Sequence, residues 1–278
     1  EPGRAGRSVA ISAIEHSAVL DTALALPGHT AILPINRDAV VDPQAAFPDD
    51  LGIVSVMQVN NEVGTIQPVA HLYDRAKAHG ALFVCDAVQA AGKIPIAEAD
   101  LIAVSAHKFY GPKGIGALWV RDGVDLAPQI TGGGQEGGLR SGTLSPALCA
   151  GMGAAAQLAL ERMDEDAAHV SALWDRAVEL FAGWHLNGSA EQRYKGNLNI
   201  RRDGLDVSRL ISDVRDVMFS AGSACASESN KPSRILSAIG LSTEQARGSV
   251  RLGFGRYTTL DELERAANLI KDAASQQG

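Results

Sequence analysis

Residues 101–113 read LIAVSAHKFYGPK: an apolar run leads directly into a histidine and a lysine, and a Gly-Pro pair then breaks the chain. A short run of apolar residues without polar alternation is typical of a strand that is buried on both faces. A strand that surfaces into a polar loop would explain an isolated His-Lys pair. The pair gains significance only if other strand-like runs also end in polar side chains.

Five further strand-like runs lie in the first half of the chain. They are VAISAI (9–14), TAILPI (30–35), GIVSVMQV (52–59), ALFVCD (81–86) and GALWV (116–120). The intervening segment PVAHLYDRAKAHG (68–80) has apolar residues at helical spacing, a proline at its start and a glycine at its end. This β–α alternation predicts an α/β fold with a doubly wound, mainly parallel sheet, whose ligands bind at the carboxyl ends of the strands.

The pattern changes after a glycine-rich segment at 131–143. Helical periodicity dominates at 145–163 and 172–184, and a last helix at 259–274 opens with a Thr-x-x-Glu capping box. The expected domains are a large domain at 1–168 and a smaller C-terminal α+β domain at 169–278.

The composition narrows the class of protein. The 278 residues are 46% hydrophobic and carry a formal net charge of −7, which disfavours nucleic acid as a partner. The apolar runs are too short to span a bilayer and no signal peptide is visible, so we expect a cytoplasmic protein that does not bind membranes. The three cysteines fit neither a disulfide framework nor a metal site, which indicates a reducing compartment.

Polar side chains gather where four of the strands should end. They are His16, Asn61, Asp86 with Gln89, and Ser105 with His107 and Lys108. Caps and surface turns explain one such residue, but four groups at one edge of a sheet are harder to dismiss. The set matches the needs of pyridoxal phosphate, because a lysine forms a Schiff base and a carboxylate keeps the pyridine nitrogen protonated. The glycine-rich segments lack Walker spacing, which argues against a nucleotide loop.

Seven segments carry a resemblance to a known family. They are IEHSAVLD (14–21), QVNNEVGTIQ (58–67), VCDAVQAAGK (84–93), SAHKFYGPKGIGALWV (105–120), GGGQEGGLRSGT (132–143), SAGSACAS (220–227) and SVRLGFGRYTT (249–259). In these segments the chain resembles cysteine desulfurases, which belong to the class V aminotransferase family of fold-type I pyridoxal enzymes. Around Cys225 it resembles the housekeeping and nitrogen-fixation branch, which has a longer, mobile cysteine loop. The family also has an amino-terminal stretch, with part of the phosphate site, ahead of the position of residue 1.

The resemblance implies a role for each matching residue of the cofactor site. His16 stacks on the ring and assists proton transfers, and Asp86 pairs with the pyridinium nitrogen. Lys108 is the Schiff-base lysine and the acid/base at the substrate α-carbon. The remaining cofactor contacts are Asn61 and Gln89 to the ring oxygen, Ser105 and His107 to the phosphate, and Thr143 to the phosphate of the neighbouring subunit.

The resemblance also implies the reaction. Arg251, with Asn61, binds L-cysteine through its carboxylate, and Cys225 takes the sulfur as a persulfide while L-alanine leaves. The expected partners are a sulfur acceptor or iron–sulfur scaffold protein and a second copy of the chain in a homodimer, without a metal. The sulfur would serve iron–sulfur cluster assembly or tRNA thiolation.

Two alternatives remain open. One is another family activity, such as selenocysteine lyase or aminotransferase, although aminotransfer has no need of Cys225. The other is a catalytically silent, truncated paralogue that acts as a binding partner, against which the presence of Lys108, Asp86 and Cys225 counts. The other two cysteines, Cys85 in a strand and Cys149 in a helix, are expected in the core, because free cysteine packs as a small hydrophobic residue.

Overall fold

The computed structural model describes residues 5–222 and 233–277. The chain divides into two compact units, and each contains its own sheet. Unit 1 comprises Glu1–Leu33, Pro43–Gln58 and Pro68–Met163, and unit 2 comprises Pro34–Asp42, Val59–Gln67 and Asp164–Gly278.

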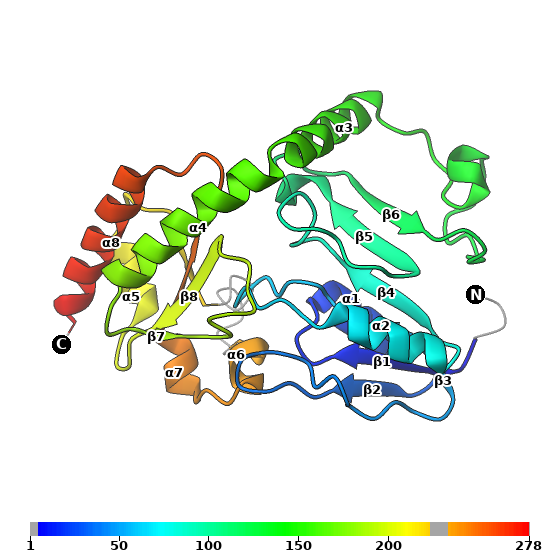
Figure 1. Cartoon of the computed structure of the whole chain (residues 1–278), viewed down its shortest axis with the longest axis horizontal. Coiled ribbons are helices and arrows are strands. Elements are labelled where there is room, and N and C mark those ends of the chain that lie inside the picture. Colours follow the sequence, from blue (N-terminus) through cyan, green and yellow to red (C-terminus); the bar gives the residue numbers. More distant parts are fainter. Residues whose placement is uncertain (1–4, 223–232, 278) are drawn as a thin grey trace. The chain divides into compact units, whose positions relative to one another are not determined.

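Six strands form the sheet of unit 1, in the order β2-β1-β3-β4-β5-β6 (Figure 1). They are β1 (Ser8–Ser12), β2 (Thr30–Leu33), β3 (Leu51–Ser55), β4 (Leu82–Asp86), β5 (Leu101–Ser105) and β6 (Gly116–Val120). All neighbouring strands are parallel except β5 and β6. Each predicted run overlaps one of these strands, which confirms the expected mainly parallel sheet.

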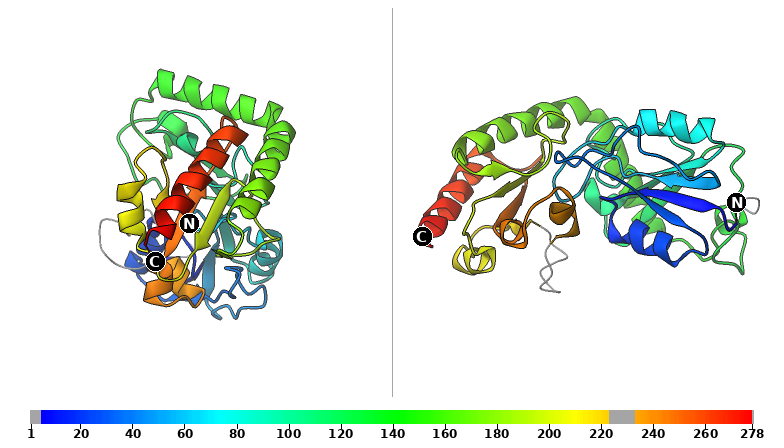
Figure 2. Two further views of the ribbon diagram at one scale, coloured as in Figure 1. Left: turned by 90° about the vertical axis from the view of Figure 1, so that its left-hand side faces the viewer. Right: turned by 90° about the horizontal axis from the view of Figure 1, so that it is seen from below.

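Helices lie on both faces of this sheet. The helical elements of unit 1 are α1 (Ser17–Ala25), α2 (Val69–Ala78), α3 (Pro146–Glu161) and the short 3₁₀ turns η2 (Ala106–Lys108) and η3 (Gln135–Gly138). Figure 2 shows α1 and α2 on opposite faces, as a doubly wound fold requires. In α2 the buried residues are Val69, Leu72 and Ala76, so the apolar spacing read from the sequence marks the covered face.

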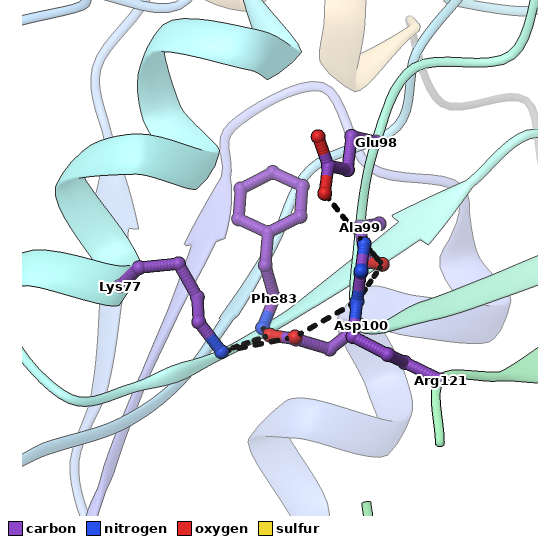
Figure 3. A network of polar contacts seen from close by, with 6 residues as sticks. All are labelled: Lys77, Phe83, Glu98, Ala99, Asp100 and Arg121. Carbon is purple, nitrogen blue, oxygen red and sulfur yellow. Dashed lines mark hydrogen bonds and ion pairs between the residues drawn. The ribbon is translucent and has the colours of Figure 1, made fainter. Parts of the chain in front are cut away.

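A buried carboxylate joins β4, β5 and α2 inside unit 1 (Figure 3). The side chain of Asp100 is 1% exposed, and Lys77 Nζ approaches its two oxygens at 3.0 and 3.2 Å. The backbone N–H of Phe83 donates to Asp100 Oδ2 at 2.9 Å, and Arg121 Nε lies 3.6 Å from Oδ1. Removing this carboxylate would therefore take away the acceptor of the buried Phe83 N–H and the carboxylate that pairs with Lys77, whereas Arg121 would keep its bonds to Glu98 and to the Ala99 carbonyl.

Asp100→Ala should lower the free energy of unfolding by about 3 kcal/mol, because a buried ion pair and a buried hydrogen bond are both broken. Asp100→Asn is the matched control, since its side-chain oxygen can still accept from Phe83. We expect Asp100→Asn to lose clearly less free energy of unfolding than Asp100→Ala. Urea unfolding of the cofactor-free variants measures both, and an alanine variant as stable as the wild type would contradict this role.

The expectation that the strands are covered on both faces is wrong for part of the sheet, and so is one expectation about a cysteine. Ile32 of β2 is 47% exposed, and in β5 only Leu101 is buried. The strand β6 was expected to be covered on both faces, yet Leu118 and Trp119 are 50% and 49% exposed. Cys149 was expected in the core, yet it is exposed. The helix α3 is apolar on all sides, and its covered face is the one with Ala155 and Ala159. At 100° per residue, Cys149 lies well away from that face. The expectation for Cys85 is confirmed, since that residue is 0% exposed.

Unit 2 is built on a four-stranded antiparallel sheet in the order β7-β8-β10-β9. Its strands are β7 (His185–Leu186), β8 (Asn197–Arg201), β9 (Ser220–Ala221) and β10 (Ser249–Gly253). Its helices are α4 (Met163–Leu180), α5 (Val207–Asp213), α6 (Arg234–Ala238), α7 (Thr243–Arg247) and α8 (Leu260–Ser275). The predicted capping box at the start of α8 is present. Within the described residues, no helix combines the length and apolarity needed to cross a bilayer.

The two short segments of unit 2 that come from the first half of the chain are tied to it by polar contacts. Gln67 Nε2 donates to the carbonyl of Ala39 at 2.8 Å, which joins the two segments to each other. The buried guanidinium of Arg193 donates to the carbonyl of Val63 at 3.0 Å. A single boundary at residue 168 therefore does not describe the division, because side-chain contacts far apart in sequence decide where these segments belong.

Candidate active site

Three loops of unit 1 carry most of the predicted site residues, and each follows a parallel strand. β1 leads to His16, β4 ends at Asp86 and β5 ends at Ser105. β4 and β5 are neighbours, and their register pairs Asp86 with Ala103. Because parallel strands end at the same edge of a sheet, the polar side chains share the edge where such folds bind ligands.

The loop after β5 explains why this apolar strand is followed by two cationic residues. The chain makes one 3₁₀ turn, η2, in which Ala106 is buried whereas His107 and Lys108 are exposed. The backbone N–H of Gly111 donates back to the Ala106 carbonyl at 2.9 Å. A Cβ at Gly111 would lie 2.9 Å from the Cβ of Ala106, so a glycine is needed for this close turn. Phe109 is buried beneath it and anchors the loop.

The predicted phosphate pair is in contact. Ser105 Oγ lies 2.9 Å from His107 Nδ1, a hydrogen-bond distance. The hydroxyl and the ring therefore point to the same side of the turn. A hydroxyl and an imidazole N–H are suitable donors for phosphate oxygens.

Asp86 occupies the end of β4, where its environment makes the ionised form costly. Its Oδ1 accepts a hydrogen bond from the backbone N–H of Val88 at 2.9 Å. Burial raises the pKa of Asp86 above the usual range, while the Val88 hydrogen bond and the nearby His16 charge lower it in part. A partly buried carboxylate of this kind gains from a cationic partner, which a pyridinium N–H would supply.

Asp86→Asn should raise the melting temperature of the cofactor-free protein at about pH 8, because it removes a charge that burial disfavours. Asn keeps an acceptor for Val88. Because the folded-state pKa is raised, the charge of Asp86 begins to weaken folding above the unfolded-state pKa, and the effect is complete above the folded-state pKa. The advantage of Asn should therefore shrink as the pH falls below the folded-state pKa and disappear below the unfolded-state pKa. Thermal unfolding of both proteins across this pH range is the measurement. The same variant should also lose most of its turnover. An advantage that grows towards acid pH would contradict the assignment.

His16 is held by the helix that it begins. It is the N-cap of α1, and its Nδ1 accepts a hydrogen bond from the backbone N–H of Ala18 at 3.1 Å. In the neutral ring this hydrogen bond assigns the proton to Nε2. The exposed ring of His16 therefore presents an N–H donor, which suits a group that stacks on a cofactor and moves protons.

Gln89 lies one turn after Asp86 and has a partner that sequence reasoning missed. Lys93 Nζ donates to Gln89 Oε1 at 2.8 Å. Burial, and then the charge of Lys108, lower the pKa of the half-buried Lys93 to about 8. The available signal was the position of Lys93, four residues after Gln89 in the motif VCDAVQAAGK.

Asn61 and Arg251 belong to unit 2, where they contact each other. Arg251 on β10 donates from Nη1 to the Asn61 carbonyl at 2.9 Å. Asn197 Nδ2 donates to the same carbonyl at 3.1 Å. The guanidinium predicted to bind the substrate carboxylate is thus held by the segment that carries Asn61. Their roles towards cofactor and substrate stay predictions.

Two predicted residues lie apart from these contacts. Thr143 is exposed, in the segment of unit 1 that precedes α3, and its role at a neighbouring subunit stays a prediction. Cys225 lies outside the described residues. Ser233, the first residue described after it, caps α6 and donates its hydroxyl to Glu62.

Cys85 should resist alkylation in the native protein whereas Cys149 should react. Burial, followed by the charges of Asp86 and Glu15, raises the pKa of the Cys85 thiol to about 12, so almost no thiolate is present at neutral pH. Cys149 is exposed. Iodoacetamide labelling with peptide mass mapping, before and after urea denaturation, checks this. Labelling of Cys85 in the folded protein would contradict it.

The profile of the family described as Aminotransferase class-V matches residues 2–266. The chain belongs to the class-V aminotransferase family. Cysteine desulfurase IscS of Colwellia psychrerythraea (strain 34H) is 42% identical over 286 aligned residues, covering 96% of this chain and 70% of that protein. The protein of that name from Rickettsia rickettsii (strain Iowa) is 42% identical over 272 residues, covering 92% and 66%.

Solved structures agree with this class-V assignment. A NifS-like protein superposes with a TM-score of 0.88 at 31% identity, covering 97% of this chain and 75% of that one. The expected fold-type I fold, the resemblance to cysteine desulfurases and the pyridoxal phosphate cofactor are thereby confirmed. The chain spans about two thirds of the length of the curated relatives, 70% and 66% for the two named.

The residues of unit 1 fit this class-V cofactor. Lys108 offers an exposed amine for the aldehyde, and Asp86 a partly buried carboxylate for the pyridinium nitrogen. The Ser105–His107 pair offers phosphate donors. Each group comes from the carboxyl end of β4 or β5, so the donors that the cofactor needs are grouped on neighbouring strands.

Proposed function

We propose that this chain acts as a cysteine desulfurase, which converts L-cysteine to L-alanine and leaves the sulfur on Cys225. The observation that carries the proposal is the placement of the Lys108 amine and the Asp86 carboxylate at the ends of two neighbouring parallel strands. The 42% identity to proteins named cysteine desulfurase supports this activity.

Each residue of the proposed site has a role that suits its chemistry. Lys108 attaches the cofactor and then, as a free amine, takes the α-proton of the substrate. His16, with its Nε2–H, assists proton transfers beside the ring, and Arg251 pairs with the substrate carboxylate. When bound, pyridoxal phosphate supplies an electron sink for the charge that develops on the substrate carbons.

The sulfur transfer needs a thiolate. The Cys225 thiolate forms a bond to the substrate sulfur, and the bond between that sulfur and the β-carbon breaks, with its electron pair left on carbon. Protonation of that carbon completes L-alanine. L-Cysteine and one enzyme thiol thus give L-alanine and one enzyme persulfide. In this reaction the sulfur of the enzyme thiol is oxidised and the β-carbon of the substrate is reduced.

A direct assay tests the proposal. The purified protein, incubated with pyridoxal phosphate and then L-cysteine, should acquire a visible absorbance band, release L-alanine and gain the mass of one sulfur atom on the peptide that carries Cys225. Cofactor binding without alanine release would instead favour a silent paralogue. A faster reaction with selenocysteine than with cysteine would favour a lyase of that specificity.

The wider setting is also part of the proposal. The persulfide sulfur would pass to an acceptor or iron–sulfur scaffold protein, and the relatives named cysteine desulfurase IscS support a role in sulfur transfer. We propose the cytoplasm as the place of this transfer. The chain would act as a homodimer in which Thr143 contributes to the phosphate site of the other copy. Sedimentation of the cofactor-loaded protein tests this, because a monomer that holds the cofactor at full affinity would exclude a composite site.

A further inference from the structure

The loop after β4 places a lysine where it can control a predicted cofactor contact. Backbone hydrogen bonds from Lys93 and Ile94 to the Ala90 carbonyl, both at 3.0 Å, fold this loop into tight turns. These turns bring the side chain of Lys93 back to that of Gln89. The ammonium of Lys93 donates to Gln89 Oε1 at 2.8 Å.

This hydrogen bond selects one of the two orientations of the Gln89 amide. A side-chain amide has an acceptor end and a donor end, and the two can exchange by a flip. An ammonium can only donate hydrogen bonds. It therefore bonds to the oxygen of the amide and cannot bond to the NH₂ group. With Lys93 on Oε1, the NH₂ group is left as the part of Gln89 that can meet a ligand. The ring oxygen that Gln89 is expected to contact is an acceptor, so this is the productive orientation.

The backbone around Lys93 is fixed against the loop that carries Lys108. Gly92 has φ of +71°, and a Cβ there would lie 2.7 Å from Phe109 Cβ and 3.0 Å from Ala159 Cβ. No side chain fits at position 92, so the two loops touch directly. The nearness of Lys93 to Lys108 affects the pKa of Lys93. Burial, and then the charge of Lys108, lower this pKa to about 8. Lys93 is thus close enough to Lys108 to be affected by its charge, while its own Nζ donates to Gln89.

We propose that Lys93 is a positioning residue that orients the Gln89 amide, so that its NH₂ group donates to the ring oxygen of pyridoxal phosphate. This inference rests on the proposed function, because it assumes that Gln89 contacts the cofactor. In this role Lys93 affects the cofactor through Gln89. Its contribution should therefore vanish when Gln89 is absent, which a structural role in the loop would not require.

A double-mutant cycle on cofactor affinity tests this. Equilibrium titration of the cofactor-free protein with pyridoxal phosphate gives a Kd for wild type, Lys93→Met, Gln89→Ala and the double variant. Lys93→Met should weaken binding by about 5- to 10-fold, the size of one hydrogen bond. In the Gln89→Ala background the same change should have almost no effect. Lys93→Arg, which keeps a cationic donor, should restore most of the affinity.

Other outcomes separate the proposal from its rivals. An equal loss of affinity with and without Gln89, together with a lower melting temperature of the cofactor-free protein, would show a structural role and overturn the inference. So would a Lys93→Met variant with the wild-type Kd. Failure of the wild-type protein to bind the cofactor would overturn the proposed function instead.

Discussion

Lys108→Ala should lower the rate of alanine release from L-cysteine by at least about 10³-fold, since one amine serves both covalent attachment and proton transfer. In the structure this amine is exposed at the end of η2, and its buried neighbours Ala106 and Phe109 fix the turn that presents it. No water molecule can take over the covalent role. The variant should also lose the linkage that borohydride reduction makes permanent.

The competing amine in this prediction is Lys93. Its pKa of about 8 makes it easier to deprotonate than an ordinary lysine, and its pKa is sensitive to Lys108. However, Lys93 is half-buried and its Nζ is bonded to Gln89, so we expect it not to replace Lys108. Borohydride reduction followed by peptide mass mapping decides between them, with Lys108→Arg as the control that keeps the charge. A reduced cofactor adduct on Lys93, in either protein, would refute the assignment of Lys108.

The central strands could be predicted because their sequences leave little choice. β1 is buried at all five positions and β3 at four of its five, so continuous apolar runs describe them well. The same reasoning failed for β6, whose sequence GALWV reads like the others although most of the strand is exposed. An apolar run predicts a strand, but it does not show what covers that strand.

The site could be predicted in its strand-end residues and not in its supporting contacts. Asp86, Ser105 and Lys108 follow from a general rule about where parallel sheets bind ligands. The Lys93–Gln89 hydrogen bond depends on the path of a loop that has no regular pattern in sequence. The two short segments assigned to unit 2 were missed for a similar reason, because Arg193 and Gln67 hold them through carbonyl groups that any residue possesses.

Cys225→Ser should abolish the added sulfur and lower alanine release by at least about 10³-fold, because a serine hydroxyl is far less acidic and less nucleophilic towards sulfur than a thiol. Binding of L-cysteine and removal of the α-proton need only Lys108, His16 and the cofactor. The variant should therefore still change its absorbance when L-cysteine is added. This combination, a retained spectral response without product, separates the two halves of the reaction.

The other two cysteines provide matched controls, and the structure predicts that they differ. Cys85→Ser places a hydroxyl where the side chain is 0% exposed, so it should lower stability by about 1–3 kcal/mol without changing the chemistry of the folded enzyme. Cys149→Ser, at an exposed position, should change neither. Alanine release and intact mass across the three variants are the measurements. If the extra sulfur maps to Cys85 or Cys149, or if Cys225→Ser turns over at the wild-type rate, the sulfur does not pass through Cys225 and the proposed reaction fails at its central step.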